Sequence, residues 1–349
     1  MAGMADGLPA SMPAAVIQGD RTVAVERRPL PEVGPTDVLL EVSHCGICGS
    51  DIHMVLEGWG RKGSIGGHEW SGRVVAVGEA VQGWSVGDLA VGGADPGCGR
   101  CDYCVAGKPV LCTGRTAPGT GSSQGAFAGY VRAGATSLLA VPGGMDPRVA
   151  ALTEPLAVAM HGLTNGGVQP GQRVLVTGAG PIGLLTIAAL RARGVGDVVV
   201  SEPSEGRREL AVAVGATGAV APDELTIPDF PMTVPDPAYD VVLECSGHDV
   251  AMEAGLAQLR PAGTLVLVGA GIERPRWDPN RILLNELHVT GAYCYDDHGC
   301  DRALELLATG DLPTDALVEP DDVPLGDVQS ALERLHHGEL AGKVMVTPR

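Results

Sequence analysis

The sequence predicts an α/β protein with two domains, one a barrel of short strands and the other a doubly wound parallel sheet. Its 349 residues exceed the size, roughly 250 to 300 residues, at which one hydrophobic core stops growing. Short β runs broken by Gly and Pro fill residues 13–142. From residue 172 onward, apolar β runs alternate with helical segments. We therefore expect domains at residues 1–150 and 151–292, with residues 293–349 returning to the first domain.

The first domain is expected to be antiparallel and barrel-like, because only a possible turn of helix after Gly49 interrupts its β runs. The expected strands are residues 14–18, 22–26, 37–44, 72–77, 88–91, 126–131 and 138–141. The first dozen residues are small and polar with no period, and we expect a mobile tail there.

The second domain is expected to open with a helix at residues 150–162. Its β runs are continuously apolar, which is typical of parallel strands buried on both faces. The expected strands are residues 174–177, 198–201, 241–245, 264–268 and 288–292, and the helices are 182–193, 205–214 and 249–259. Two further helices at 300–308 and 326–336 and a strand at 343–347 complete the chain.

Charge and composition exclude several classes of function. The chain has 24 Lys and Arg against 42 Asp and Glu, a formal charge of −18, so we expect no nucleic-acid partner. It has no run of about 18 apolar residues, and its first fifteen residues lack the features of an export signal. We expect a cytoplasmic protein with no membrane partner. Its nine cysteines are then expected to be metal ligands or buried thiols rather than disulfides.

The segment VLVTGAGPIG, residues 174–183, carries a GxGxxG motif directly after an expected strand and at the start of a helix. Gly178 would permit the tight turn, Gly180 would let the backbone approach a pyrophosphate, and Gly183 would allow close helix–strand contact. The helix N-terminus would offer free N–H groups to the phosphates. The candidate cofactor contacts are Gly178, Gly180, Pro181, Ile182 and Gly183. The alternative is a structural Gly-rich turn.

Glu202 ends the next expected strand, 19 residues after Gly183. A carboxylate there can accept hydrogen bonds from both adenosine ribose hydroxyls and repel a 2′-phosphate, which favours NAD over NADP. Arg207 and Arg208 weaken that preference, because an arginine nearby could pair with a 2′-phosphate.

Cys98, Cys101, Cys104 and Cys112 form a CxxCxxCx7C pattern in a glycine-rich stretch at residues 95–114. Four thiolates this close can hold one zinc ion tetrahedrally, with no position left for catalysis. The pattern predicts a structural zinc lobe, and the alternatives are disulfides or an iron–sulfur cluster.

A second, dispersed set of residues could hold a catalytic zinc ion. It comprises Cys48, Ser50, Asp51 and His53 in CGICGSDIH, His68 and Glu69 in GGHEW, and Glu154 in LTEPLAV. Cys, His and carboxylate ligands from separate segments leave a fourth position for water or substrate. Each residue alone would have an ordinary structural explanation, but together with the dinucleotide motif they favour catalysis.

At these residues the chain resembles the zinc-dependent medium-chain dehydrogenases, closest to the sorbitol, butanediol and threonine dehydrogenase branch. The resemblance covers residues 13–349 and rests on GICGSDIH, GGHEWSG, the four-cysteine lobe, LTEPLAVAMHG and VTGAGPIG in family order. It implies a GroES-like β-barrel catalytic domain, a Rossmann domain and a C-terminal return. It also implies one catalytic and one structural zinc ion, and a homodimer or homotetramer.

The resemblance implies roles for individual residues. Cys48 and His68 would hold the catalytic zinc with a carboxylate, either Glu69 or Glu154, and a water. Asp51 would hydrogen-bond the ligand histidine. Ser50 would contact the reacting alcohol, and His53 would end the proton relay, which passes through the nicotinamide ribose. Lys343 matches a basic position near the pyrophosphate, or is a solvated surface lysine.

The expected function is hydride transfer between a secondary alcohol, such as a polyol, diol or cyclic alcohol, and NAD, giving the ketone. The alternatives within the family are an aldehyde or primary-alcohol dehydrogenase, including a glutathione-dependent aldehyde oxidiser, and a zinc-free quinone or enone reductase. Outside enzymes, the alternative is a non-catalytic module that binds zinc and dinucleotide. We expect Glu57, Trp59 and Arg61 to be candidate substrate contacts.

Overall fold

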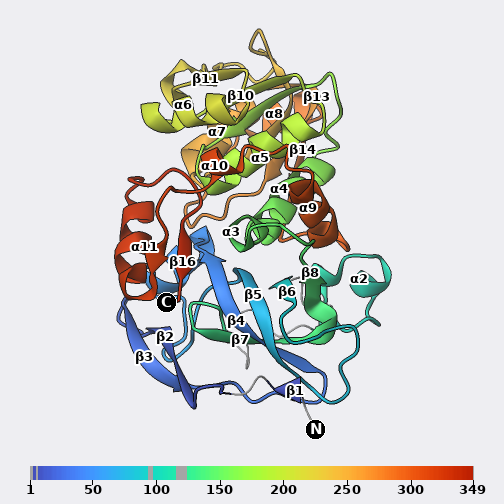
Figure 1. Ribbon diagram of the computed structural model, residues 1–349. Coiled ribbons are helices and arrows are strands. Elements are labelled where there is room, and N and C mark those ends of the chain that lie inside the picture. Colours follow the sequence, from blue (N-terminus) through green and yellow to red (C-terminus); the bar gives the residue numbers. More distant parts are fainter. Residues whose placement is uncertain (1–2, 5–6, 93–96, 115–123, 349) are drawn as a thin grey trace. The chain divides into compact units, whose positions relative to one another are not determined.

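The computed structural model describes residues 3–4, 7–92, 97–114 and 124–348, and it divides into two compact units (Figure 1). The first unit comprises residues 1–154, 296–310 and 319–349. The second comprises residues 155–295 and 311–318. The C-terminal segment, residues 293–349, therefore contributes to both units. Residues 95–96 of the predicted zinc lobe lie outside the described residues.

An eight-stranded sheet dominates the first unit, with the order β15-β16-β4-β5-β6-β8, β1 beside β5 and β7 beside β4. Strands β2 and β3 form a separate antiparallel pair. The strands are β1 Gly3–Met4, β2 Ser11–Ile17, β3 Val23–Pro29, β4 Asp37–Gly46, β5 Glu69–Val77, β6 Leu89–Gly92, β7 Tyr130–Gly134, β8 Leu138–Ala140, β15 Val323–Pro324 and β16 Met345–Thr347. The pairs within the large sheet are antiparallel except β15 with β16, so the predicted antiparallel class is confirmed.

Two local predictions for the first unit are wrong. The apolar run at residues 126–129 lies before β7, because Ala126 and Phe127 bond to the backbone of Gly67 and Gly66 as a buried loop. The predicted tail is also partly ordered: Gly3 and Met4 pair with β5, and β2 begins at Ser11. A single-sequence pattern misses such pairings because their partners are distant in sequence.

The helices of the first unit are short. They are α1 Gly49–Val55, α2 Asp102–Val105, α3 Pro147–Ala150, α9 Gly299–Ala308 and α11 Val328–His336, with the 3-10 turns η1 Pro109–Leu111, η2 Ala135–Ser137 and η4 Leu325–Asp327. The predicted helix at 150–162 is instead two helices, α3 and α4 Thr153–Asn165. Asp146 caps α3 by accepting from the Arg148 N–H, and the Thr153 hydroxyl donates to the Ala150 carbonyl at the break. Among the described residues, no helix has the length and apolar character needed to cross a bilayer.

The second unit is a six-stranded parallel sheet with the order β11-β10-β9-β12-β13-β14. Its strands are β9 Arg173–Thr177, β10 Asp197–Ser201, β11 Gly218–Val220, β12 Tyr239–Glu244, β13 Leu259–Leu267 and β14 His288–Gly291. Its helices are α4 from residue 155 onward, α5 Pro181–Ala192, α6 Glu205–Val214, α7 Asp249–Ala257, α8 Pro279–Leu284 and α10 Thr314–Leu317, with the 3-10 turn η3 Pro222–Glu224. This strand order is that of dinucleotide-binding Rossmann sheets, so the doubly wound prediction is confirmed. The order reverses between β9 and β12, where such sheets bind their ligand.

Several elements of the second unit were not predicted, among them β11, α8, α10 and the turn η3. Strand β11 has only three residues, all partly buried, which is too short for a β pattern to be recognised. The start of α8 is marked by Asp278, which accepts from the Asn280 N–H, and by Pro279. Both are ordinary N-terminal signals, and the six residues that follow show too little periodicity to extend them.

Candidate active site

Three candidate zinc ligands meet at one end of the β4–β5 pair. Cys48 follows β4, His68 precedes β5, and Glu69 begins β5 opposite Gly46. One ligand atom from each lies within 4.8 Å of the others. Glu69 is buried, Cys48 is half-buried and His68 is exposed. A thiol, an imidazole and a carboxylate with one accessible side fit a catalytic zinc ion.

Asp51 supports the backbone on both sides of this cluster. Its side chain is buried, and its oxygens accept from the backbone N–H of Cys48 at 2.9 Å and of Gly67 at 3.2 Å. Burial raises the pKa of Asp51. Loss of solvation lowers the pKa of His68. The nearby Cys48 and Asp51 side chains outweigh this effect and raise that pKa well above its usual value. Asp51 thus orients the two segments that carry Cys48 and His68.

Glu69 and Lys343 form a buried ion pair that the sequence did not predict. The Lys343 Nζ lies 2.7 Å from both Glu69 carboxylate oxygens and donates to the Ile47 carbonyl at 3.1 Å. The residues are 0% and 1% exposed. The alternative of a solvated surface lysine is therefore wrong. Burial alone would lower the pKa of Lys343, but the nearby Glu69 and Cys48 raise it above its usual value. Its role at a pyrophosphate stays a prediction, one that requires this pair to open.

Gly46 makes room for that ion pair. A Cβ on Gly46 would lie 2.3 Å from Glu69 Oε2 and 3.2 Å from Lys343 Cδ. Glu69 Oε2 is buried and forms no hydrogen bond of good geometry with the described residues. This oxygen is ion-paired with Lys343 and keeps room to accept further, so beside a thiol and an imidazole it is chemically suited to a metal ion.

Glu154 lies in the first turn of α4 and is half-buried. Burial raises the pKa of Glu154 to about 7, with His68 opposing the shift. Glu154 is not part of the group whose ligand atoms lie within 4.8 Å of one another. Of the two predicted carboxylates, the structure brings Glu69 together with Cys48 and His68.

Ser50 and His53 lie on α1, immediately after Cys48. Ser50 is half-buried in the first turn. The His53 Nδ1 lies 2.8 Å from Glu57 Oε2, and its ring stacks on Trp59 with 5.1 Å between the ring centroids. Cys45 is fully buried in the core, and burial raises the pKa of its thiol. The motif CGICGSDIH thus contains one core cysteine, Cys45, beside the half-buried candidates Cys48, Ser50 and His53.

The four cysteines of the predicted lobe also come together. Their sulfur atoms lie within 4.8 Å of one another, and the Cys112 sulfur accepts from the N–H groups of Cys98 and Gly114. All are free rather than disulfide-bonded. Backbone N–H groups of Cys104 and Thr113 lower the pKa of Cys101 to about 6, whereas loss of solvation raises the pKa of Cys104 to about 11. This cluster of free sulfurs fits a tetrahedral zinc ion.

The three glycines of the GxGxxG motif differ in backbone conformation and in the space around them. Gly178 has φ +91°, and a Cβ there would lie 2.9 Å from the Ser246 Cβ. A Cβ on Gly183 would lie 2.0 Å from the Gly178 carbonyl oxygen. A Cβ on Gly180, by contrast, would meet nothing within 4 Å. Gly178 and Gly183 are therefore required for packing, and the space beside Gly180 fits an approaching pyrophosphate. Pro181 and Ile182 begin α5 directly after it.

Glu202 lies beside that turn, at the end of β10. Its side chain is 4% exposed, and its oxygens accept from the N–H of Ala179 at 2.8 Å and of Ser204 at 3.0 Å. Arg208 donates to the backbone carbonyls of Glu202 and Pro203. The carboxylate is thus held against the GxGxxG turn, while Arg207 lies in the first turn of α6.

Glu244 is a supporting residue of this region that the sequence did not reveal. It is buried, and Oε1 accepts from the N–H of Ser246 at 2.8 Å and of Gly247 at 3.0 Å. A Cβ on Gly247 would lie 2.3 Å from the Ala270 carbonyl oxygen. The loop after β12 is therefore fixed against both the GxGxxG turn and the loop after β13. Its only sequence signal is a carboxylate at the end of an apolar strand.

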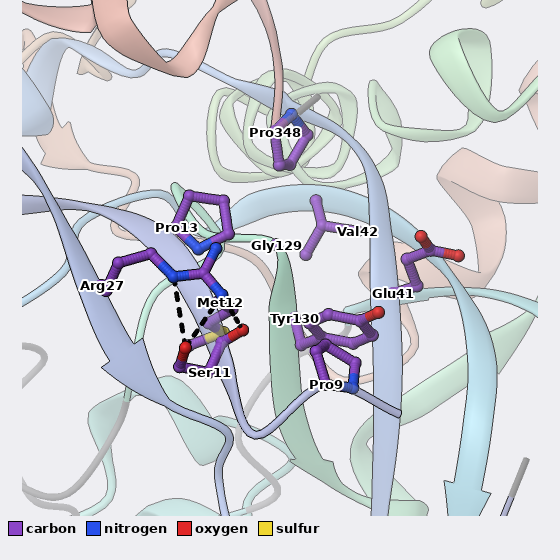
Figure 2. A pocket seen from close by; sticks show the side chains of 10 residues that line it. All are labelled: Pro9, Ser11, Met12, Pro13, Arg27, Glu41, Val42, Gly129, Tyr130 and Pro348. Carbon is purple, nitrogen blue, oxygen red and sulfur yellow. Dashed lines mark hydrogen bonds between the residues drawn. The ribbon is translucent and has the colours of Figure 1, made fainter. Parts of the chain in front are cut away.

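A cavity of about 210 Å³ in the first unit is separate from these residues (Figure 2). Its lining includes Arg27, Ser11, Glu41 and Tyr130, and none of the candidate site residues. The Arg27 guanidinium donates to the Ser11 carbonyl and hydroxyl. Its main cationic group therefore already has partners within the chain.

The comparison with protein families agrees with both halves of this architecture. A model described as "Alcohol dehydrogenase GroES-like domain" matches residues 34–143, and one described as "Zinc-binding dehydrogenase" matches residues 181–309. The fold and the site define a zinc-dependent alcohol dehydrogenase, an oxidoreductase. The chain belongs to the zinc-dependent medium-chain alcohol dehydrogenase family.

Individual relatives cover almost the whole chain. Sorbitol dehydrogenase of Bacillus subtilis (strain 168) is 33% identical over 99% of this chain and 99% of its own. D-xylulose reductase A of Aspergillus niger is 32% identical over 93% of each. A putative zinc-binding dehydrogenase from Sinorhizobium meliloti, bound to NADP, has a TM-score of 0.86 and 31% identity, covering 97% of this chain and 100% of that one. The 2R,3R-butanediol dehydrogenase of B. subtilis has a TM-score of 0.84 and 29% identity, with the same coverage.

Proposed function

We propose that this enzyme oxidises a secondary alcohol of the polyol or diol class to the ketone, with NAD as the hydride acceptor. The observation that carries the proposal is the meeting of Cys48, His68 and Glu69 beside Ser50. Sorbitol, xylulose and butanediol, the compounds named for the relatives, share a secondary alcohol or its ketone next to another hydroxyl group.

In this proposal Cys48, His68 and Glu69 hold the catalytic zinc, and Cys98, Cys101, Cys104 and Cys112 hold a second, structural zinc. A catalytic zinc ion lowers the pKa of a coordinated alcohol so that its alkoxide forms near neutral pH. Asp51 keeps the Cys48 and Gly67 backbones in place. Ser50 accepts the alcohol proton, and His53 passes it toward solvent. Glu154 lies near the cluster as a second carboxylate.

For the cofactor, Gly178, Gly180, Pro181, Ile182 and Gly183 form the pyrophosphate-binding turn. Glu202 accepts hydrogen bonds from the adenosine ribose hydroxyls, which favours NAD over NADP. Its carboxylate already points at the Ala179 N–H within the turn, in support of that role. Arg207, in the first turn of α6, is the residue we expect to pair with a 2′-phosphate if NADP binds.

The deciding experiment is a screen of polyols, diols, cyclic alcohols, primary alcohols and aldehydes with NAD and with NADP, followed at 340 nm. We expect NAD-dependent oxidation of vicinal secondary alcohols. Turnover confined to primary alcohols or aldehydes would overturn the substrate class. Absence of turnover with every compound, in protein that contains zinc and binds NADH, would favour a non-catalytic binding module.

We also propose that the enzyme is a cytoplasmic homodimer or homotetramer. Strand β14 is an edge of the six-stranded sheet, and an open edge can pair with a second copy of the chain. Leu283, Leu284 and Val289 near this edge are exposed. Light scattering after size-exclusion chromatography measures the molecular mass, and a monomer would contradict the assembly.

A further inference from the structure

The chain after α1 folds back so that two side chains contact His53. Helix α1 ends at Val55, and Gly58 with φ +78° reverses the chain. The Trp59 N–H then donates to the His53 carbonyl at 3.3 Å, and the Gly60 N–H to the Met54 carbonyl at 2.8 Å. A Cβ on Gly60 would lie 2.7 Å from that same carbonyl oxygen, so the turn admits no larger residue there. The backbone therefore fixes where residues 57 and 59 lie.

This turn brings a carboxylate to one ring nitrogen of the histidine. Glu57 Oε2 lies 2.8 Å from His53 Nδ1, and the side chains are only 23% and 17% exposed. Both atoms are shielded from solvent, and neither forms a hydrogen bond of good geometry with the described residues, so their 2.8 Å contact is an ion pair by distance alone. Each is therefore the other's natural partner. Two shielded polar atoms at this distance would each be costly if left unsatisfied.

Trp59 restrains the same ring from its face. The imidazole and indole rings are nearly parallel, at 20°, with centroids 5.1 Å apart. Trp59 itself is 63% exposed, so its position is better explained by the stack and the backbone hydrogen bond than by burial in the core. The histidine is thus held at its face and at Nδ1, which leaves Nε2 as the nitrogen available for proton exchange.

We propose that Glu57 is a positioning residue for proton transfer through His53. The Glu57 carboxylate keeps the proton of neutral His53 on Nδ1, so that Nε2 is the acceptor. Nε2 takes up the proton released from the alcohol, and the carboxylate stabilises the resulting imidazolium. The proton then leaves from Nε2 to water, which returns His53 to its starting tautomer. The inference rests on the proposed function, because it assigns His53 to the proton path. It also removes Glu57 from the candidate substrate contacts.

The first test is a double-variant cycle on alcohol oxidation by the zinc-loaded enzyme. Glu57→Gln keeps the size of the side chain and removes its charge, and we expect kcat to fall roughly tenfold to a hundredfold. In a His53→Gln background the same substitution should change kcat less than about twofold, because Glu57 acts only through His53. A Glu57→Gln effect of equal size in both backgrounds, or no effect in either, would overturn the proposal.

A matched control is Asp301→Asn, which removes the carboxylate from an exposed contact with His298 Nδ1 at 3.6 Å. It should leave kcat unchanged. Zinc content and the dissociation constant for NADH should be unchanged in Glu57→Gln, since the residue contacts neither site in the proposal. Loss of zinc from this variant would assign Glu57 a structural role and overturn the proposal.

The second test does not depend on turnover. Nitrogen-15 chemical shifts of the imidazole report which nitrogen carries the proton, and the His53 signal is the one missing from His53→Gln. We expect Nδ1–H in the wild type and a shift toward the Nε2–H form in Glu57→Gln. An enzyme that oxidises no alcohol but shows this change loses the proposed function while the pairing stands. Identical tautomers in both proteins would overturn the positioning role even if the alcohol screen succeeds.

Discussion

The zinc cluster of the first unit and the dinucleotide turn of the second are supported by different kinds of contact. Around the turn, the contacts are uncharged or involve a neutral backbone donor: Gly183 packs on the Gly178 carbonyl, and the Ala179 N–H donates to the Glu202 carboxylate 23 positions later. At the zinc cluster, Glu69 is paired with Lys343, 274 positions later in the chain. The turn needs no buried cation, whereas the dispersed cluster depends on a charge supplied from a distant segment.

The four-cysteine lobe is an informative intermediate between the two. Its four cysteines lie close together in sequence, like the residues of the turn, yet the site we propose there is for a metal ion rather than a cofactor. Gly97, Gly99 and Gly107 have φ values of +67°, +67° and +71°, which lets the short segment wrap around four sulfurs. The lobe and the turn bind different kinds of ligand, yet both are short segments in which glycines permit the required backbone conformation.

The largest effect is expected from Cys48→Ser. Losing a thiolate from the dispersed cluster should remove the catalytic zinc and lower kcat by about a thousandfold or more, because the metal stabilises the developing alkoxide. The fold should survive, since Cys48 is only half-buried. Steady-state kinetics and elemental analysis measure both effects. The matched control is Cys45→Ala, which should keep its zinc and its turnover. Full activity of Cys48→Ser would disprove the ligand assignment.

Cys101→Ser should act on stability instead of chemistry. A structural zinc contributes folding free energy directly, so weakening it should lower Tm by roughly 10 °C or more. The remaining folded protein should keep its catalytic zinc and a near-normal kcat per folded chain. Calorimetry and zinc content give the two readouts. A variant with one zinc fewer and an unchanged Tm would show that the lobe does not depend on its metal.

Lys343→Met tests the long-range support directly. It leaves the Glu69 carboxylate buried without its cation, and breaking such a pair costs roughly 3 to 5 kcal/mol of unfolding free energy. The double variant Lys343→Met/Glu69→Gln removes the charge as well and should regain part of that loss. Denaturant unfolding measures both. Equal losses in the single and double variants would mean that the pair does not stabilise the first unit.

The same contrast explains what the sequence could predict. The GxGxxG turn, the four-cysteine lobe and the α1 motif are runs of neighbouring residues whose spacing determines their geometry, so each was recognised directly. The parallel, doubly wound class of the second unit followed from the alternation of β and α segments, but its strand order did not. Helix α4 was misplaced because its start at Thr153, where the hydroxyl donates to the Ala150 carbonyl, follows a separate short helix that the apolar pattern did not distinguish from it.

Contacts between distant segments were not predictable from spacing. Nothing in GKVMV distinguishes a buried Lys343 from an exposed one, because its burial depends on β16 pairing with the end of β4. The need for glycine at position 46 could not be predicted either, because it arises from the Glu69 carboxylate that packs against Gly46 in the fold. Glu57 lies four positions after His53, but α1 ends between them, so the helical i, i+4 rule would not have predicted their contact.

The smallest effect is expected at Glu202, beside the dinucleotide turn, and would appear as a change in cofactor preference. If Glu202 binds both ribose hydroxyls, Glu202→Ala removes charged hydrogen bonds worth roughly 1.5 to 3 kcal/mol and the repulsion that excludes a 2′-phosphate. We expect kcat/KM for NAD to fall about tenfold or more, since roughly 1.4 kcal/mol is a factor of ten, and kcat/KM for NADP to rise.

The fold should tolerate this change better than Lys343→Met, because the backbone N–H groups of Ala179 and Ser204 that Glu202 now accepts from are neutral and leave no unpaired charge behind. The control Glu205→Ala removes an exposed carboxylate from the first turn of α6 and should leave the NAD to NADP ratio of kcat/KM unchanged. That ratio is measured for wild type and both variants at fixed pH and saturating alcohol. A wild type that already prefers NADP, or a Glu202→Ala ratio equal to that of wild type, would show that Glu202 only braces the turn and does not select the cofactor.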